Sequence, residues 1–155
     1  MNREVLILIC SWVLSLYLLL RYIPIESKRL AWITFIFVHA IAWIHEYLQL
    51  VFGLVEFPYR EFNKATNMSF SLHYIVYPTF AVFFILFYPK EKAARGTFLY
   101  YLLFSMGITT YSYLLEKYSL LYHYIHWNWF IGLITNMIIL YVVKIYIYWF
   151  KKGLV

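Results

Sequence analysis

One polar stretch interrupts the chain, Gly53-Leu-Val-Glu56-Phe-Pro58-Tyr-Arg60-Glu61-Phe-Asn63-Lys64-Ala-Thr66-Asn67. It is the only long run in the middle of the chain in which apolar residues do not dominate. Its charged and amide side chains, with a proline among them, predict a connecting region at a membrane surface. The segments before and after it are long and apolar enough to be membrane helices.

The composition places the chain in lipid. Of its 155 residues, 65% are hydrophobic and 13% are charged, whereas a soluble domain is about half apolar and a quarter charged. Because a water-soluble fold could not cover so much apolar surface, we expect an all-α bundle in the membrane, formed as one domain over 1–155. The net charge of +6 comes from cations at helix ends. It therefore indicates membrane lipids as partners and not nucleic acid.

The apolar runs predict five transmembrane helices. Their expected ranges are 4–22, 30–55, 68–88, 96–115 and 128–150. Pro24 ends the first span, because the residue before a proline avoids helical geometry. Pro78 lies inside the third span, where it should bend the helix and release a backbone carbonyl. Cys10 is the only cysteine and lies in an apolar run, so it predicts neither a disulfide nor a thiolate metal site.

The positions of the cations predict the orientation. With five spans, eight Lys or Arg residues fall at one membrane surface and four at the other. Because cytoplasmic loops carry the excess of Lys and Arg, we expect the N-terminus outside and the C-terminus in the cytoplasm. The stretches 56–67 and 116–127 then face outward. The eight are Arg21, Lys28, Arg29, Lys90, Lys92, Arg95, Lys151 and Lys152, and the four are Arg3, Arg60, Lys64 and Lys117.

Each expected span has a stripe of polar residues at helical spacing. These stripes should face one another, because unsatisfied polar groups are costly in hydrocarbon. Glu46 is the one acidic residue deep within a span, and a carboxyl at that depth indicates a functional site. We expect Glu46 to be neutral or to share a proton with His39, at the floor of a cavity that opens outward. The expected ligand-binding residues are Glu46, His39, Gln49, His73, Thr109 and Asn136.

The stripes also allow a second interpretation, in which they only hold the helices together. The protein would then be structural or would bind a membrane partner, and a homo-oligomer is compatible with either interpretation. The chain has no serine in a nucleophile-elbow context, no glycine-rich phosphate loop, no Cys–His pair and no HExxH spacing. We therefore expect no catalytic residue, cofactor or metal site, and a multi-pass protein that binds a small molecule, a lipid or an ion.

The central polar stretch is expected to form an outer cap on the bundle. Arg60 lies close enough in sequence to pair with Glu56 or Glu61, and Glu116 of the other outer connector is a further candidate partner. Two interpretations are open, a salt-bridged cap over the bundle and a gate or recognition surface over the cavity mouth. The apolar side chains expected to bury under the cap are Phe57, Phe62 and Phe70.

Six short motifs distinguish the chain beyond its composition. They are Glu56-Phe-Pro-Tyr-Arg60-Glu61-Phe, Lys64-Ala-Thr66-Asn67-x-Ser69-Phe70, Tyr77-Pro78, Phe87-Tyr88-Pro89, Glu116-Lys117-Tyr118 and Tyr124-Ile125-His126-Trp127. In these motifs the chain from Glu46 onward resembles a family of small integral membrane proteins found mainly in spore-forming Firmicutes, the bacilli and clostridia, with no established function. The resemblance implies five spans in a bacterial plasma membrane or spore inner membrane, and it supplies no catalytic residue.

Overall fold

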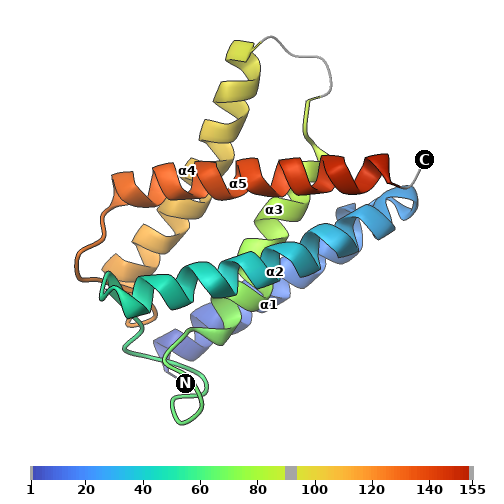
Figure 1. Cartoon of the computed structure of the whole chain (residues 1–155). Coiled ribbons are helices and arrows are strands. Elements are labelled where there is room, and N and C mark those ends of the chain that lie inside the picture. The colour runs from blue at the N-terminus through green and yellow to red at the C-terminus, as the bar shows by residue number, and fades with distance from the viewer. Residues whose placement is uncertain (1, 90–93, 154–155) are drawn as a thin grey trace.

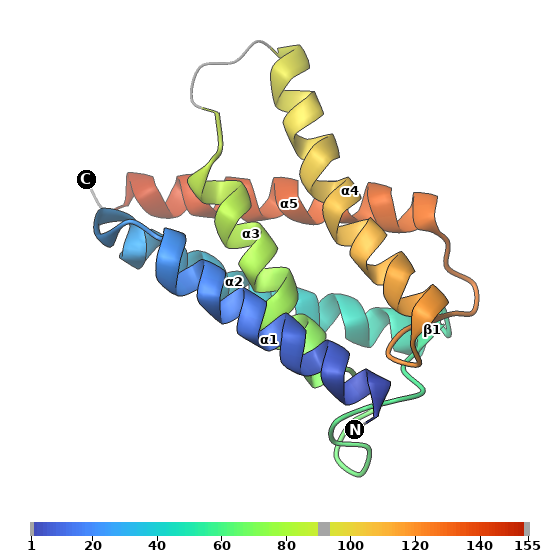
Figure 2. The same cartoon turned by 180° about the vertical axis from the view of Figure 1, so that it is seen from behind.

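The computed structural model describes residues 2–89 and 94–153. Its described elements are five α-helices, two short helical turns and one two-stranded ladder (Figures 1 and 2). In chain order they are α1 (Arg3–Tyr22), the 3₁₀ turn η1 (Ile25–Ser27), α2 (Lys28–Val51), β1 (Val55–Glu56), the π-helical turn η2 (Leu72–Val76), α3 (Tyr77–Leu86), α4 (Ala94–Tyr118), β2 (His123–Tyr124) and α5 (Trp129–Lys152).

Four helices, α1, α2, α4 and α5, are long and apolar enough to cross a membrane. The remaining apolar helix, Leu72–Leu86, is shorter and lies mostly buried among the others. The all-α class is therefore confirmed, and the chain is a multi-pass membrane protein whose outer surface contacts lipid.

The helices α1, α3 and α5 run away from the end of the molecule at which the N-terminus lies, and α2 and α4 run back toward it, so the two termini lie at opposite ends (Figure 1). One end, which we call the connector end, gathers the start of α1, the end of α2, the start of α3, the end of α4 and the start of α5. The remaining helix ends, which are the α1–α2 junction, the end of α3, the start of α4 and the end of α5, point away from it, and we call them together the opposite end (Figures 1 and 2). Toward the opposite end, α3 and α4 diverge in both views.

The second span ends earlier than expected. The range 30–55 is wrong at its end, because α2 stops at Val51. Gly53 follows in the left-handed conformation, with φ of 61°, which is a common way for a helix to terminate. The next backbone N–H, that of Leu54, donates back to the Gln49 carbonyl at 2.8 Å. The chain then leaves the helix axis and enters β1.

The third helix begins two residues after the expected start of the span 68–88 and ends two residues before its expected end. The chain becomes helical only at Phe70. The Glu61 carboxylate accepts the backbone N–H groups of Phe70 at 3.2 Å and Ser71 at 2.9 Å, as an N-cap side chain does for the free donors of a first helical turn. Before it, the Thr66 hydroxyl accepts the Met68 N–H at 3.0 Å and holds the chain in a turn.

The residues just before Pro78 form the π-helical turn η2, and the release of a backbone carbonyl expected from Pro78 is seen there. Tyr77 donates its N–H to the Leu72 carbonyl, one residue farther back than in an α-helix. Pro78 has no N–H, so it cannot continue this pattern onto the carbonyl of His73. That carbonyl instead accepts a hydrogen bond from His39 Nδ1 of α2 at 3.3 Å. Pro78 thus creates a backbone acceptor that a neighbouring helix uses.

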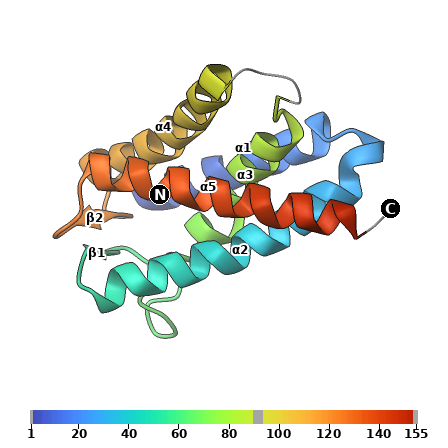
Figure 3. The same ribbon diagram turned by 45° about the horizontal axis from the view of Figure 1, so that its top comes forward.

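The two connectors at the connector end are joined to each other. β1 and β2 pair antiparallel, with Val55 opposite Tyr124 and Glu56 opposite His123 (Figure 3). Tyr59 N–H donates to the Leu120 carbonyl at 2.8 Å. We call residues 52–71 and 119–128 together the connector cap. Since its backbone groups bond to each other, the cap folds onto the bundle instead of extending into water.

Phe57 and Phe62 of the cap differ in how far their side chains are buried. Phe57 is fully buried and packs edge-on against the Tyr122 ring, with centroids 5.1 Å apart. Phe62 is 51% exposed, so its predicted burial is wrong. It lies in the turn after Arg60, which leaves one edge of its ring on Phe70, with centroids 5.2 Å apart, and the rest outside.

Candidate functional site

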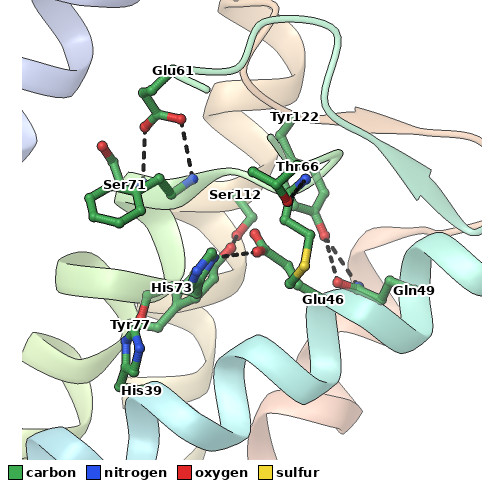
Figure 4. Close-up of polar contacts among 12 residues, drawn as sticks. His39, Glu46, Gln49, Glu61, Thr66, Ser71, His73, Tyr77, Ser112 and Tyr122 are labelled. Atoms are coloured by element: carbon green, nitrogen blue, oxygen red, sulfur yellow. Dashed lines mark hydrogen bonds and ion pairs between the residues drawn. The ribbon is translucent and has the colours of Figure 1, made fainter. Parts of the chain in front are cut away.

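The most buried charged group of the structure is the carboxyl of Glu46 on α2. Glu46 is 1% exposed, and its Oε2 lies 2.6 Å from Nδ1 of His73 on η2, which is itself 4% exposed (Figure 4). At this distance the two atoms share one proton. The second carboxylate oxygen, Oε1, is also buried and has no hydrogen-bond partner among the described residues. Glu46 is therefore only half satisfied.

The proton sharing predicted between Glu46 and His39 is wrong. Seven residues separate the two along α2, which is about 10 Å of helix, so they share a face without touching. His73 enters between them from η2. It bonds Glu46 through its ring and His39 through its backbone carbonyl, so all three residues belong to one connected set.

An interior cavity lies beside this set, between α2, α4, α5 and the connector cap. About 40 Å³ of it is open to the centres of water-sized molecules, which is room for a few waters or one small ion. Apolar residues such as Val38, Ala42 and Leu140 form part of its wall. The residues with hydroxyl and amide groups on its wall are Gln49, Tyr77, Thr109, Ser112, Tyr122, Tyr124 and Asn136.

Hydrogen bonds between helices fix these polar groups. Asn136 Nδ2 donates to the Thr109 hydroxyl at 3.0 Å, which joins α5 to α4. Gln49 Nε2 donates to the Tyr122 hydroxyl at 3.2 Å, which joins α2 to the cap. Burial raises the pKa of Tyr122 well above its usual value, so Tyr122 remains a neutral phenol. The polar stripes of different spans therefore do face one another.

Glu46 and the cavity are neighbours, although Glu46 is not part of the cavity wall. Tyr77 and Tyr122 belong to the wall and also lie close enough to Glu46 to interact with its charge. Figure 4 shows Tyr122 and Gln49 on one side of Glu46 and His73 on the other. The expected ligand-binding residues thus fall into two groups. Buried Glu46 and His73 and half-buried His39 form the connected set at the α2–η2 contact, whereas Gln49, Thr109 and Asn136 line the cavity.

Sequence reasoning missed several cavity residues. His45 lies about 100° around α2 from Glu46, so helical spacing does not place it on the face of Glu46. In the structure that rotation turns it into the cavity, where its Nε2 is buried without a partner among the described residues. Tyr122 was missed because it lies in a connector, where no helical period indicates which way a side chain points. Tyr77 and Ser112 were visible as members of polar stripes, and their hydroxyls lie 3.3 Å apart.

The predicted ion pairs of the outer cap are not formed. Within 2–89 and 94–153, the ion pairs are His73–Glu46 and Arg3–Glu4, so Arg60 pairs with none of Glu56, Glu61 and Glu116. The Glu61 carboxylate instead accepts backbone N–H groups of the first turn of the third helix. The backbone of Glu56 is held in β1 with its side chain exposed. The cap is therefore held by backbone hydrogen bonds and by buried Phe57, not by a salt bridge.

Comparison with known proteins adds no family to this description. No protein-family model, no curated protein and no solved structure matches the chain. The chain is characterised by its own structure, as a multi-pass membrane protein with four membrane-length helices and a shorter, buried fifth.

Proposed function

We propose that this protein binds a small monovalent cation in the polar interior of its connector end, and that Glu46 balances the charge of that cation. The observation that carries the proposal is the half-satisfied carboxyl of Glu46, which is 1% exposed. A carboxylate in such a position must be paired, hydrated or protonated. His73 satisfies one of its oxygens, and the other is left for a cation.

The chemistry of the neighbouring cavity supports a cation as the occupant. Its wall presents oxygen atoms of hydroxyl and amide groups, the ligands that small hard cations prefer. The aromatic rings of Tyr124 and Trp127 complete the wall, and aromatic faces attract cations. The ionisable groups around Glu46 are His73, Tyr77, Tyr122 and, farther away, Glu61. None of these adds a permanent positive charge that would repel a cation.

The proposal includes five membrane crossings in one domain, with the N-terminus outside and the connector end facing out. The resemblance to membrane proteins of Firmicutes suggests a bacterial plasma membrane or spore inner membrane, and a role in sporulation. Arg21, Lys28, Arg29, Arg95, Lys151 and Lys152 all lie in segments of the opposite end, and such an excess favours the cytoplasm. Lys90 and Lys92, also counted there, lie outside the described residues.

Cysteine labelling tests this orientation. Cysteines replacing Lys64 or Leu120, both exposed at the connector end, should react with an impermeant maleimide on intact cells. Cysteines replacing Lys28 or Lys151, exposed at the opposite end, should react only after lysis. Cys10 is replaced by serine throughout, because it is exposed too. Labelling of the Lys28 and Lys151 positions on intact cells would reverse the orientation.

Substitution of Glu46 tests the function. Glu46→Gln keeps the size and hydrogen bonding of the side chain but removes its charge. The melting temperature of the purified protein is measured in ammonium, sodium and choline chloride at equal ionic strength. We expect ammonium or sodium to raise the wild-type melting temperature above that in choline, since a ligand that binds only the folded state stabilises it. Glu46→Gln should fold but lose this response, whereas Glu56→Gln, which removes an exposed carboxylate, should keep it.

A structural role is the second candidate function. It is favoured by the hydroxyls of Thr109 and Ser112, which bond to carbonyls of their own helix, and by the interhelical pairs already described. In that case Glu46→Gln should lower the melting temperature in every salt, and the wild type should melt at the same temperature in all three salts. That pair of results would exclude the cation proposal.

A further inference from the structure

A lateral groove lies on the other side of Glu46, between α2, η2 and the connector cap. It is open and has a volume of about 490 Å³. None of its lining residues belongs to the interior cavity, so the two are separate places. The residues of its wall with polar or aromatic side chains are His39, Trp43, Thr66, Phe70, His73 and Tyr74.

Both histidines of the groove are held through the same ring nitrogen. His39 Nδ1 donates to the backbone carbonyl of His73 at 3.3 Å, and His73 Nδ1 lies 2.6 Å from Glu46 Oε2. A carbonyl oxygen can only accept, so His39 carries its proton on Nδ1. With the proton of His73 also on Nδ1, facing the carboxylate, each neutral ring keeps a lone pair on Nε2.

The two Nε2 atoms are free and reachable. Neither has a hydrogen-bond partner in the described part of the chain. Neither belongs to the buried atoms that lack a partner, which distinguishes both from Nε2 of His45. Both Nε2 atoms therefore keep some exposed surface, and both residues line the groove. The Tyr74 ring packs edge-on against His39, with centroids 4.1 Å apart, and fixes that imidazole in place.

This is the arrangement of histidines that bind a metal ion. A ligating histidine almost always donates its other N–H to a carboxylate or a backbone carbonyl, which fixes the tautomer and the direction of the ring. In the groove, the Nδ1 atom of His73 faces the Glu46 carboxylate and that of His39 donates to a backbone carbonyl. Two imidazoles on one ion at ~2.1 Å place their ring centres about 5 to 6 Å apart. The centroids of His39 and His73 are 5.8 Å apart.

We propose that His39 and His73 bind a transition-metal ion through their Nε2 atoms, with zinc as the representative of the ions that imidazole prefers. Glu46 acts behind His73 as a positioning residue, and its negative charge offsets part of the charge of the ion. Among residues 2–89 and 94–153, no three His, Cys, Asp or Glu side chains converge on one point. The remaining coordination positions are therefore open to water or to a ligand in the groove.

Asparagine substitutions separate the metal site from the packing. The amide nitrogen of an Asn side chain can occupy the position of histidine Nδ1 and donate the same hydrogen bond. Asn has no atom at the position of histidine Nε2. His39→Asn and His73→Asn therefore keep the bonds to the His73 carbonyl and to Glu46 while removing the proposed ligand atoms. His45→Asn is the matched control, because His45 is on the same helix but faces the cavity. The protein is prepared without a histidine tag and placed in lipid nanodiscs.

Zinc affinity is measured by competition with a fluorescent chelator, and coordination by the visible absorption of added cobalt. Wild type and His45→Asn should bind one zinc with the same affinity and give a cobalt band. Each groove variant should lose the band and most of the affinity. Glu46→Gln should keep the band and bind zinc about 10 to 100-fold more weakly, as expected for a lost partner of a ligand.

Three results would overturn the proposal. One is a wild type that binds zinc no better than a His39→Asn/His73→Asn double variant. Another is an equal loss of affinity in His45→Asn, which would indicate nonspecific binding. The last is an unchanged zinc affinity in His39→Asn. This variant leaves the Glu46–His73 pair intact, so it tests the proposal even if His73→Asn does not fold. The cavity proposal is unaffected by any of them, because it does not involve His39.

Discussion

The connector end and the opposite end of the bundle are built from the same helices but held by different forces. The core of the connector end mixes apolar residues such as Phe57 and Leu72 with polar pairs such as Glu46–His73. In the core of the opposite end, Phe84 lies among the rings of Tyr88, Tyr100, Tyr101 and Phe104, and the buried hydroxyls of Thr34 and Ser105 pair with no other helix among the described residues. The difference indicates that packing is enough to hold helices in lipid, and that polar side chains gather where water or a ligand can reach.

The treatment of charge differs in the same way. At the opposite end, Lys144 Nζ lies over the Tyr88 ring at 4.9 Å and the Tyr148 ring at 5.5 Å, so aromatic faces accommodate the cation. At the connector end, Glu46 is left with a free oxygen. The half-buried cation of the opposite end is accommodated within the chain, whereas the buried carboxyl of the connector end keeps an oxygen without a partner among the described residues.

The largest expected effect comes from replacing one buried phenylalanine by alanine in the core of each end. Phe57 and Phe84 are both fully buried. Phe57→Ala should cost about 3–5 kcal/mol of unfolding free energy, because the cap is surrounded by water and both the transfer and the cavity cost apply. Phe84→Ala should cost less, by roughly the 1.5–3 kcal/mol of the transfer contribution, because its surroundings outside the protein are lipid. Reversible unfolding in mixed micelles measures both, and equal losses would remove the distinction between the two ends.

A smaller effect is expected at the start of the third helix. Glu61→Ala removes the acceptor of the Phe70 and Ser71 N–H groups and should cost about 1 kcal/mol, as for a lost helix cap. Amide exchange at 70–72 should accelerate. Glu56→Ala is the control, because that side chain is exposed and accepts no such bond among the described residues. If exchange at 70–72 is the same in both variants, Glu61 does not set the start of the helix.

The smallest effect belongs to the polar pairs between helices. Asn136→Ala removes the bond to Thr109 and should cost about 0.6 kcal/mol, the average for such bonds in membrane bundles. Thr135→Ala is the neighbouring control, since its hydroxyl bonds only to the Ile131 carbonyl of its own helix. A loss well above 2 kcal/mol for Asn136→Ala would mean that polar pairs, and not packing, hold α5 in place.

Much of the fold could be predicted from the sequence, because apolar length and cation position are local properties. The ranges of α1, α4 and α5 agree with the expected spans to within one helical turn, and Pro78 indicated the release of a backbone carbonyl. The ends of α2 and the start of the third helix could not be predicted. They depend on Gly53 adopting a positive φ and on Glu61 reaching the backbone of Phe70 across nine residues of connector.

Several residues of the candidate site could be predicted from the sequence, but not which of them contact one another. Helical spacing placed Glu46, Gln49 and Thr109 on inward faces, and all three are buried. It could not show that His73, and not His39, meets Glu46, because that choice depends on how the π-helical turn η2 rotates the start of the third helix. Spacing within one helix also cannot show that His45 turns toward α5.

Infrared difference spectroscopy of Glu46 tests the central claim most directly. Spectra of the protein in nanodiscs are recorded with ammonium and with choline at one pH and ionic strength, for wild type, Glu46→Gln and Glu56→Gln. The account predicts that ammonium changes a carboxyl band in wild type and Glu56→Gln, because the cation binds at the Glu46 oxygen that His73 does not contact, and that this band is absent from Glu46→Gln. A wild-type difference spectrum identical to that of a folded Glu46→Gln protein would contradict it.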